Sequence, residues 1–271
     1  MSSYLIKFGT ALFCFASVVP SISNADDKNW INGYGSVALT QDQTLGQCQA
    51  AALQAAKANT FSKAGLEKFS SKQMEICSDT VEATHCELHQ QTLNYYEGAY
   101  IAGTRNVQIG NSATECTASL EANVRIYKSQ HDPSFGLEAS INGSKIKRSG
   151  EVIQIVGQVN KEAHLNLYVY SPNSTGDQYQ HIFPNQFDSK NKLNGKFQIP
   201  SFEKSKVYSF FAEFPKEHNG KAVNEWLFLL ATKSNFEVLD IESSENFHKR
   251  LDELGRENWR LAQIGYTRLA E

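Results

Sequence analysis

The sequence contains little proline and methionine, and it has no apolar run long enough to span a bilayer. Six prolines in 271 residues, beside plentiful aromatic residues, exclude a disordered chain and indicate an ordinary folded protein. The formal net charge of only -3 argues against a nucleic-acid partner bound through phosphate charge. At this length the chain can form one large domain or two small ones, each with its own core.

Motifs of common enzyme classes are absent as well. The chain has no Gly-x-Ser-x-Gly elbow, phosphate-binding loop, dinucleotide fingerprint or His-Glu-x-x-His pair. We therefore expect no enzyme and no cofactor. The alternative hypothesis is a metal-dependent hydrolase or metal-binding protein that uses a loop with His85, Cys86 and His89, which are side-chain types that bind zinc or copper. Because no second ligand cluster lies at a matching spacing, we favour a disulfide cysteine between two solvated histidines.

Residues 1–25 have the features of an export signal. Lys7 gives a weakly positive start, residues 11–19 are apolar but too short to cross a bilayer, and Ser23-Asn24-Ala25 is a small-x-small cleavage site. We therefore expect a mature chain that begins at Asp26, contains no integral membrane segment and is periplasmic or secreted.

The mature chain keeps four cysteines, Cys48, Cys77, Cys86 and Cys116. An even number in an exported domain favours two disulfides, and four cysteines allow three connectivities that sequence alone does not separate. The expected chain geometry favours one of the three connectivities, Cys77–Cys86 with Cys48–Cys116. Cys77 and Cys86 are near neighbours around a polar turn, so a bridge between them closes at small entropic cost. If strands 34–39 and 118–127 pair antiparallel, Cys48 lies near Cys116.

Residues 26–130 are predicted to form a disulfide-bonded α+β domain. A strand at 34–39 precedes an alanine-rich helix, which Thr40 or Asp42 can cap and which runs to about Lys68. Small residues on one helical face allow the helix to lie close to a sheet. The order β-α-β-β-β therefore predicts a sheet with a helix on one face. The three later strands are expected at 72–78, 92–109 and 118–127.

A polar break at His131-Asp132-Pro133 marks the expected domain boundary, and 137–242 are predicted to form an antiparallel β-sandwich. A C-terminal helix is expected over 243–271, starting at Ser243 or Ser244, although 260–269 fit either helix or a closing strand. The fold class is therefore α+β. The sandwich strands are expected at 152–159, 164–170, 196–199, 207–214 and 225–232, with 236–241 as a further candidate.

A row of aromatic residues runs through the predicted sandwich, and it has two interpretations. It is either a recognition face, where Tyr and Phe are enriched, or core and cross-strand packing, which is the commoner use of such rows. We favour packing. The residues are Tyr168, Tyr170, Tyr179, Phe183, Phe210 and Phe211.

The stretch 181–200 organises this half of the chain. Pro184 and Asn185 indicate a turn, because proline fixes φ and asparagine tolerates left-handed geometry. Asn194-Gly195 indicates a second turn, which leads into the strand at 196–199. Pro200 ends that strand because it cannot donate a ladder hydrogen bond.

Two family resemblances follow from these motifs. The structural box Ile182-Phe183-Pro184-Asn185, with Asn191 and Ile199-Pro200, resembles the bacterial domain of unknown function numbered four-three-eight-four. That resemblance covers about 150–235 and implies a small β-domain of secreted or surface-associated proteins, with no established activity.

The N-terminal half is similar to the N-terminal domain of the flagellar assembly protein T family and its outer-membrane lipoprotein relatives. The similarity rests on Gly33-Tyr34-Gly35, the alanine-rich helix and a long hairpin around Gly103. The chain departs from that family in its four cysteines. The two resemblances and the export signal predict a non-enzymatic envelope protein that acts as a binding or assembly module with an envelope protein partner. An accessory role in a cell-surface apparatus is a further possibility, and oligomeric state is not predicted.

Overall fold

The computed structural model describes residues 30–40, 44–65, 74–80, 83–89, 98–171, 177–213 and 222–269. Within 74–80 and 83–89 only the backbone is described. The predicted signal peptide, residues 1–25, lies outside these ranges.

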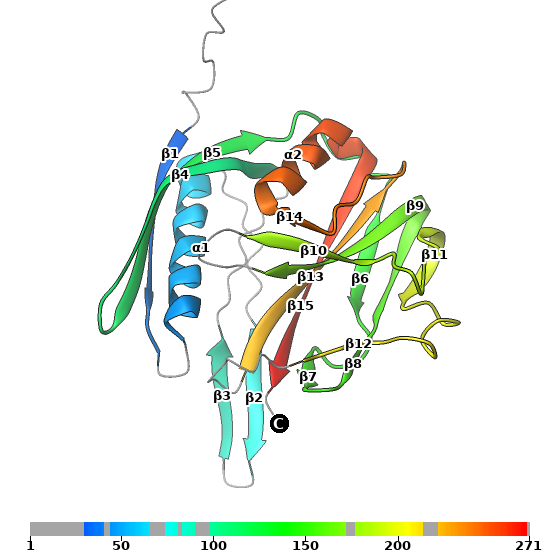
Figure 1. Cartoon of the computed structure of the whole chain (residues 1–271), viewed down its shortest axis with the longest axis horizontal. Coiled ribbons are helices and arrows are strands. Elements are labelled where there is room, and N and C mark those ends of the chain that lie inside the picture. Colours follow the sequence, from blue (N-terminus) through cyan, green and yellow to red (C-terminus); the bar gives the residue numbers. More distant parts are fainter. Residues whose placement is uncertain are drawn as a thin grey trace, which may run out of the picture.

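The chain folds as an α+β protein that is mostly β-sheet, as the sequence predicts (Figure 1). In the N-terminal half, β1 (Trp30–Ala38), β5 (Glu115–Ile126) and β4 (Ala99–Asn111) form an antiparallel sheet in that order, and α1 (Leu45–Lys63) packs on one face. The register pairs Trp30 with Asn123 and Ala38 with Glu115. Small residues along both elements make this packing possible.

Two glycines of β1 bring the helix close to the sheet. A Cβ at Gly33 would overlap the carbonyl oxygen of Ala56, and a Cβ at Gly35 would overlap that of Ala52. The buried face of α1 presents Cys48, Ala52 and Ala56 to these positions. Any side chain on either glycine would therefore push the helix away from the sheet.

The helix boundaries differ from the prediction. Thr44, and not Thr40 or Asp42, is the N-cap: its hydroxyl accepts a bond from the backbone N–H of Gln47, and the Gln47 side chain accepts from the backbone N–H of Thr44. This reciprocal capping box fixes the start of α1. The helix ends at Lys63 rather than near Lys68.

The predicted second strand, 72–78, does not join the N-terminal sheet. Among the described residues, β2 (Met74–Thr80) pairs with β3 (Ala83–His89) alone, as a separate antiparallel hairpin. Residues 85–89 are therefore strand and not the expected loop. Each strand of this hairpin takes its ladder hydrogen bonds from the other, over a register that runs from Met74 opposite His89 to Thr80 opposite Ala83.

Strand β4 also differs from its predicted form. It begins at Ala99 in the described chain, and Gly103 lies inside it at a register shift, so Gly103 does not mark a hairpin. The turn between β4 and β5 lies at 112–114, where the backbone N–H of Ser112 bonds Glu115 O at 2.7 Å. The long hairpin is present, with its turn about ten residues later than expected.

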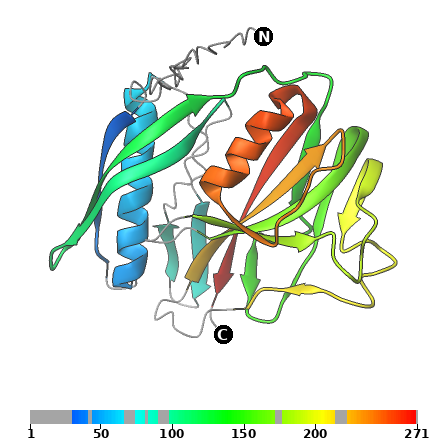
Figure 2. The same ribbon diagram turned by 45° about the horizontal axis from the view of Figure 1, so that its top comes forward.

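The C-terminal half is built around β9 (Ile155–Ser171), which pairs with two groups of strands. Its first residues, 155–159, pair with β6 and β11, and its later residues, 164–171, pair with β10 and β13. The sheet order is β14-β10-β9-β13-β15-β7, and the arrangement is sandwich-like (Figure 2). The other strands are β6 (Leu137–Ile141), β7 (Ile146–Arg148), β8 (Val152–Ile153), β10 (Gln178–Phe183), β11 (Lys192–Ile199), β12 (Phe210–Phe211), β13 (Ala222–Thr232), β14 (Ile241–Ser243) and β15 (Trp259–Leu269).

Several predicted strands change here. The segments 152–159 and 164–170 are largely one strand, β9, because β11 pairs with β9 on both sides of residues 160–162, across a register shift. The expected strand 207–214 is mostly absent from its described part, 207–213, where only Phe210–Phe211 is strand and the preceding residues 202–207 form turns. Residues 236–240 are not strand. Asn194-Gly195 lies inside β11 and is not a turn: Asn194 lies opposite three residues of β9, 160–162, at a register shift, and Gly195 takes φ 83° there.

The C-terminal helix is shorter than predicted. Ser243 caps α2 (Ser244–Leu254) by accepting from the backbone N–H of Asn246, and Gly255 at φ 85° ends the helix. A single 3₁₀ turn, η2 (Arg256–Asn258), then leads into β15. Residues 260–269 are thus the closing strand, which pairs along its full length with β13.

Candidate functional site

An aromatic layer lies between the sandwich, α2 and the N-terminal half. Alternation along β9 sends Leu165 and Leu167 into the sandwich core and Tyr168 and Tyr170 to the opposite face, under α2. This layer also takes in Tyr100 and Tyr127 of the N-terminal half. The packing interpretation is confirmed for four members of the aromatic row: Tyr168, Tyr170, Tyr179 and Phe183 are at most 6% exposed, Phe210 is half-buried, and Phe211 is 53% exposed.

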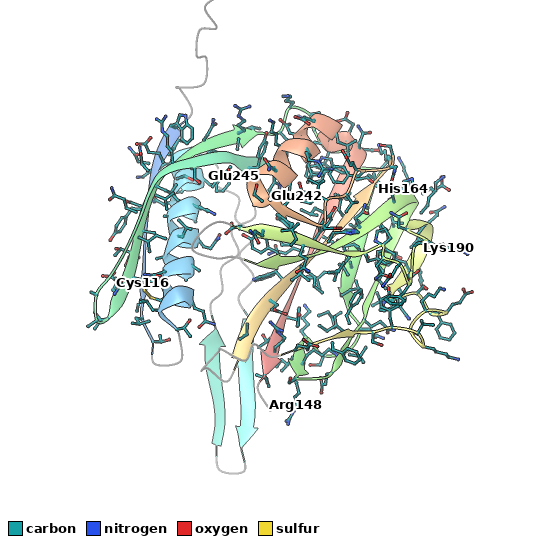
Figure 3. All side chains as sticks on the ribbon, in the orientation of Figure 1. Cys116, Arg148, His164, Lys190, Glu242 and Glu245 are labelled. Carbon is teal, nitrogen blue, oxygen red and sulfur yellow. A yellow bond between two sulfur atoms is a disulfide. The ribbon has the colours of Figure 1, made fainter. Side chains whose placement is uncertain are left out.

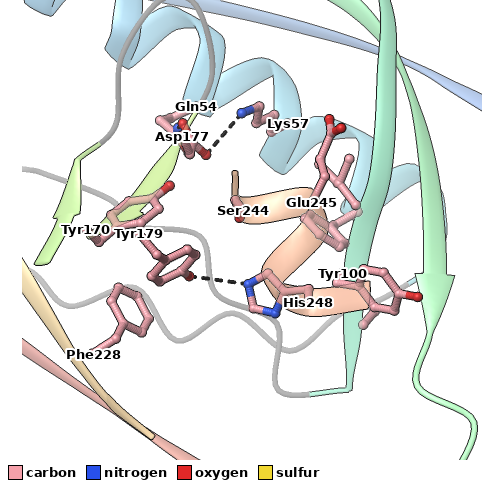
Figure 4. Close-up of a pocket in the computed structure, with 13 residues that line it drawn as sticks. Gln54, Lys57, Tyr100, Tyr170, Asp177, Tyr179, Phe228, Ser244, Glu245 and His248 are labelled. Carbon is pink, nitrogen blue, oxygen red and sulfur yellow. Dashed lines mark hydrogen bonds and ion pairs between the residues drawn. The ribbon is translucent and has the colours of Figure 1, made fainter. Parts of the chain in front are cut away.

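A small polar pocket opens at the edge of this layer (Figure 4). Its volume is about 70 Å³. It is formed by α1, β4, the start of β10, β13 and the first turns of α2. The lining residues are Gln54, Lys57, Phe61, Ala99, Tyr100, Ile101, Tyr170, Asp177, Tyr179, Phe228, Ser244, Glu245 and His248.

Asp177 joins the two halves at this pocket. Its buried carboxylate, which belongs to a residue 7% exposed, accepts from Gln54 Nε2 at 2.7 Å and from Lys57 Nζ at 3.0 Å, and both donors come from α1. Its backbone carbonyl accepts from the N–H of Ser244 at the start of α2. The ammonium and the amide compensate the carboxylate for its lost hydration. Asp177 thereby links α1, β10 and α2.

His248 forms a second link between the halves. Its Nδ1 lies 2.7 Å from the Tyr127 hydroxyl, and its Nε2 lies 3.3 Å from the Tyr179 hydroxyl. Burial lowers the pKa of His248 to about 4. The imidazole is therefore neutral at pH 7, so one ring nitrogen donates to one hydroxyl and the other accepts from the second.

One turn further along α2, Asp252 accepts from the Tyr100 hydroxyl at 3.1 Å and from the backbone N–H of Lys128 at 3.0 Å. Burial, and next the charge of Asp252, raise the pKa of Tyr100 to about 12. The phenol therefore stays protonated and donates to the carboxylate. His248 and Asp252, four residues apart on α2, both bind tyrosines of the N-terminal half.

The contacts of Asp177, His248 and Asp252 form a junction between the two halves of the chain, and the role that this junction can support is mainly structural. A volume of about 70 Å³ holds a few water molecules, whereas pockets for drug-sized ligands span about 300–1,000 Å³. At neutral pH the His248 imidazole is uncharged. Lys57 and Asp177 neutralise each other. The arrangement therefore fixes the orientation of the two halves.

The structural box lies at the far end of β10, away from this pocket. Phe183 is 1% exposed in the sandwich core. The Asn185 side chain closes the turn: its Nδ2 donates to Ile182 O, and its Oδ1 accepts from the N–H groups of Phe187 and Asp188. Asn191 contributes its carbonyl oxygen, which accepts from the N–H of Leu165. Pro200 is buried, and the Phe183–Pro184 and Ile199–Pro200 peptide bonds are cis.

The cysteines lie in two places. Cys48 of α1 and Cys116 of β5 form a disulfide with a Cα separation of 5.8 Å, which confirms the pairing expected from the antiparallel strands. Cys77 lies directly opposite Cys86 in the backbone register of β2 and β3. The side chains of that hairpin are outside the described residues, so the Cys77–Cys86 bridge stays a prediction.

The metal hypothesis concerns the same hairpin. His85, Cys86 and His89 lie in β3, and their side chains are likewise outside the described residues. Across the side chains that are described, no three His, Cys, Asp or Glu residues are grouped as a metal site would need. The metal-binding alternative therefore remains untested.

Sequence reasoning missed the residues of the junction. His248 offered one signal, since it lies beside Phe247 and Leu251 on the apolar side of the predicted helix. Asp177 offered none, because a single aspartate in a polar stretch is typical of a loop.

Comparison with protein-family models, with curated proteins and with solved structures found no match. The two family resemblances therefore stay predictions from their motifs. Within the described ranges, neither helix is long and apolar enough to cross a membrane.

Proposed function

We propose that the chain is an exported, non-enzymatic envelope protein that acts as a binding or assembly module for an envelope protein partner. The observation that carries this proposal is the outer face of the β1-β5-β4 sheet, on the side away from α1 (Figure 1). Tyr34 is 56% exposed there. The Arg105 guanidinium lies 4.2 Å from the Trp30 ring centroid, and Arg105 Nε bonds Glu121 at 2.6 Å.

These residue types favour a protein partner. Trp, Tyr and Arg are enriched at protein interfaces and carry much of the binding energy there. Stacking on Trp30 and the bond to Glu121 order Arg105 before any partner arrives, so less side-chain entropy is lost on binding. The Cys48–Cys116 disulfide supports export, because disulfides persist in oxidising compartments.

Site-specific crosslinking tests the proposal. A photoreactive amino acid at Tyr34, in protein exported by its native host, should give a discrete adduct with an envelope protein, and Arg105→Glu should reduce it. The matched control places the same crosslinker at Leu45, which is 45% exposed at the start of α1. No adduct at position 34, or the same adduct at both positions, would overturn the assignment of this face.

A further inference from the structure

A second exposed surface lies at the other end of the molecule, around β11 and β12 (Figures 1 and 2). Its apolar side chains all come from 187–211 and from β8, the partner of β12. They are Phe187 (48% exposed), Phe202 (76%), Val207 (63%), Phe211 (53%) and Val152 (46%). We call this set, with the lysines described below, the aromatic–lysine surface. Phe211 and Val152 lie opposite each other across β12 and β8, and grouped exposed apolar side chains are typical of interaction sites.

Local hydrogen bonds and ring contacts hold this surface in place. The buried Asp188 carboxylate accepts from the N–H of Ser201, which ties the box to the turns that follow. The rings of Phe187 and Tyr208 stack at 5.7 Å, and Tyr208 meets Phe210 edge-on at 5.5 Å. Phe210 in turn packs against the sandwich core. The exposed phenylalanines therefore project from an anchored scaffold.

The charge of this surface differs in sign from that of the rest of the chain. The stretch 187–211 has five lysines against Asp188 and Glu203, a net charge of +3, whereas the whole chain carries -3. One of these lysines, Lys192, pairs with Glu162 of β9 at 2.7 Å, and counting Glu162 leaves the surface at +2. The lysines are all exposed, and Lys190 points outward at the edge of the molecule (Figure 3). They are Lys190, Lys192, Lys196, Lys204 and Lys206.

We propose that the aromatic–lysine surface docks on an anionic lipid surface. Exposed phenylalanines flanked by lysines match such a surface, because the rings enter the boundary between headgroups and acyl chains while the ammonium groups stay among the anionic headgroups. A second copy of the chain fits poorly, since two surfaces of the same net positive charge would repel each other. The docking surface and the outer face of the N-terminal sheet lie at opposite ends, so one module can hold a protein partner at a membrane.

Vesicle co-sedimentation tests the proposal. The purified protein should bind vesicles that contain phosphatidylglycerol in phosphatidylcholine, bind pure phosphatidylcholine much less, and be released by high salt. Lys204→Gln with Lys206→Gln should weaken partitioning about 25-fold, since each lysine contributes a factor of about five near an anionic surface. Phe202→Ser with Phe211→Ser should reduce it by at least about tenfold, because two apolar side chains no longer insert.

Ile126→Ser is the matched control: this residue is 69% exposed but lies at the end of β5, away from the docking surface. It should bind vesicles as the wild type does, and thermal unfolding should confirm that all variants fold. No vesicle binding by the wild type, or equal binding by the control and the phenylalanine variant, would overturn the proposal. Self-association of the wild type that Phe202→Ser abolishes, in the absence of vesicle binding, would assign the surface to a second copy and also overturn it.

Discussion

Lowering the pH from 6.5 toward 4 should lower the free energy of unfolding, because His248 takes up a proton in the unfolded chain at a higher pH than in the folded one. This side chain is 8% exposed and lies between the hydroxyls of Tyr127 and Tyr179. Burial lowers its pKa from 6.5 to about 4 in the folded state, and unfolding restores the ordinary value. Between these values the unfolded chain binds a proton that the folded chain does not. The free energy of unfolding therefore falls as the pH falls.

The size of the effect follows from the two pKa values. The contribution of His248 is fully present above pH 6.5, and about 2.5 kcal/mol of it should be lost by pH 4.5. Other groups titrate in the same range. Burial raises the pKa of Glu225 and of Glu242, so these two carboxyl groups favour the folded state as the pH falls. The difference between the wild type and a His248 variant isolates the histidine.

Urea unfolding, followed by tryptophan fluorescence at several pH values between 7 and 4.5, measures this difference. His248→Gln is the variant of choice, because an amide can donate to one tyrosine hydroxyl and accept from the other. Relative to this variant, the wild type should lose about 2.5 kcal/mol over the range. His131→Gln, which changes an exposed histidine, should follow the wild type. Parallel curves for the wild type and His248→Gln would refute the reasoning.

Three further predictions concern the stability of each half. Replacing Cys48 and Cys116 by alanine removes a link across 68 residues, and loop entropy predicts a loss of about 4 kcal/mol in chemical unfolding; an unchanged midpoint would contradict it. Gly35→Ala should lower the free energy of unfolding by about 2 kcal/mol or more, because the added Cβ would meet the backbone of α1. In Gly46→Ala the added Cβ faces open space, so this variant should be neutral or stabilising. Equal shifts in melting temperature for the two variants would rule out the close approach. Phe183→Ala should lower the free energy of unfolding by about 3 to 5 kcal/mol, and unchanged melting would place this side chain outside the core.

The periodicity of the sequence predicted the faces of β9 well. Leu165 and Leu167 alternate with Tyr168 and Tyr170, and the two sets enter different cores. Alternation is a local property that survives whatever partners the strand finds. The fold class followed from the same kind of signal.

The ends of elements were less predictable, because neighbouring segments offered competing signals. Thr40 and Asp42 are good capping residues, and Thr40 also has a glutamine, Gln43, three residues later, but the reciprocal box forms between Thr44 and Gln47. Asn194-Gly195 is a strong turn signal in isolation. Its partner strand β9 pairs with β11 on both sides of it, so the left-handed glycine lies at a register shift within the strand instead of reversing the chain.

The junction between the halves could not be predicted, because its partners are far apart in the sequence. The bond between Tyr127 and His248 spans 121 residues, and the ion pair between Lys57 and Asp177 spans 120. The buried face of α2 is wider than packing on one sheet requires, because His248 and Asp252 are buried beside the apolar residues of the helix.

That width has a structural explanation. Phe247 and Leu251 of α2 pack on the aromatic face of the sandwich, while His248 and Asp252 bond Tyr127 and Tyr100 of the N-terminal half. Directional hydrogen bonds fix an orientation that apolar contact alone would leave free to slide. The outer face of the N-terminal sheet and the aromatic–lysine surface are therefore held at a set angle to each other. The proposed module, which would position a protein partner above a membrane, requires that rigidity, and breaking the His248 bridge should loosen it without altering either surface.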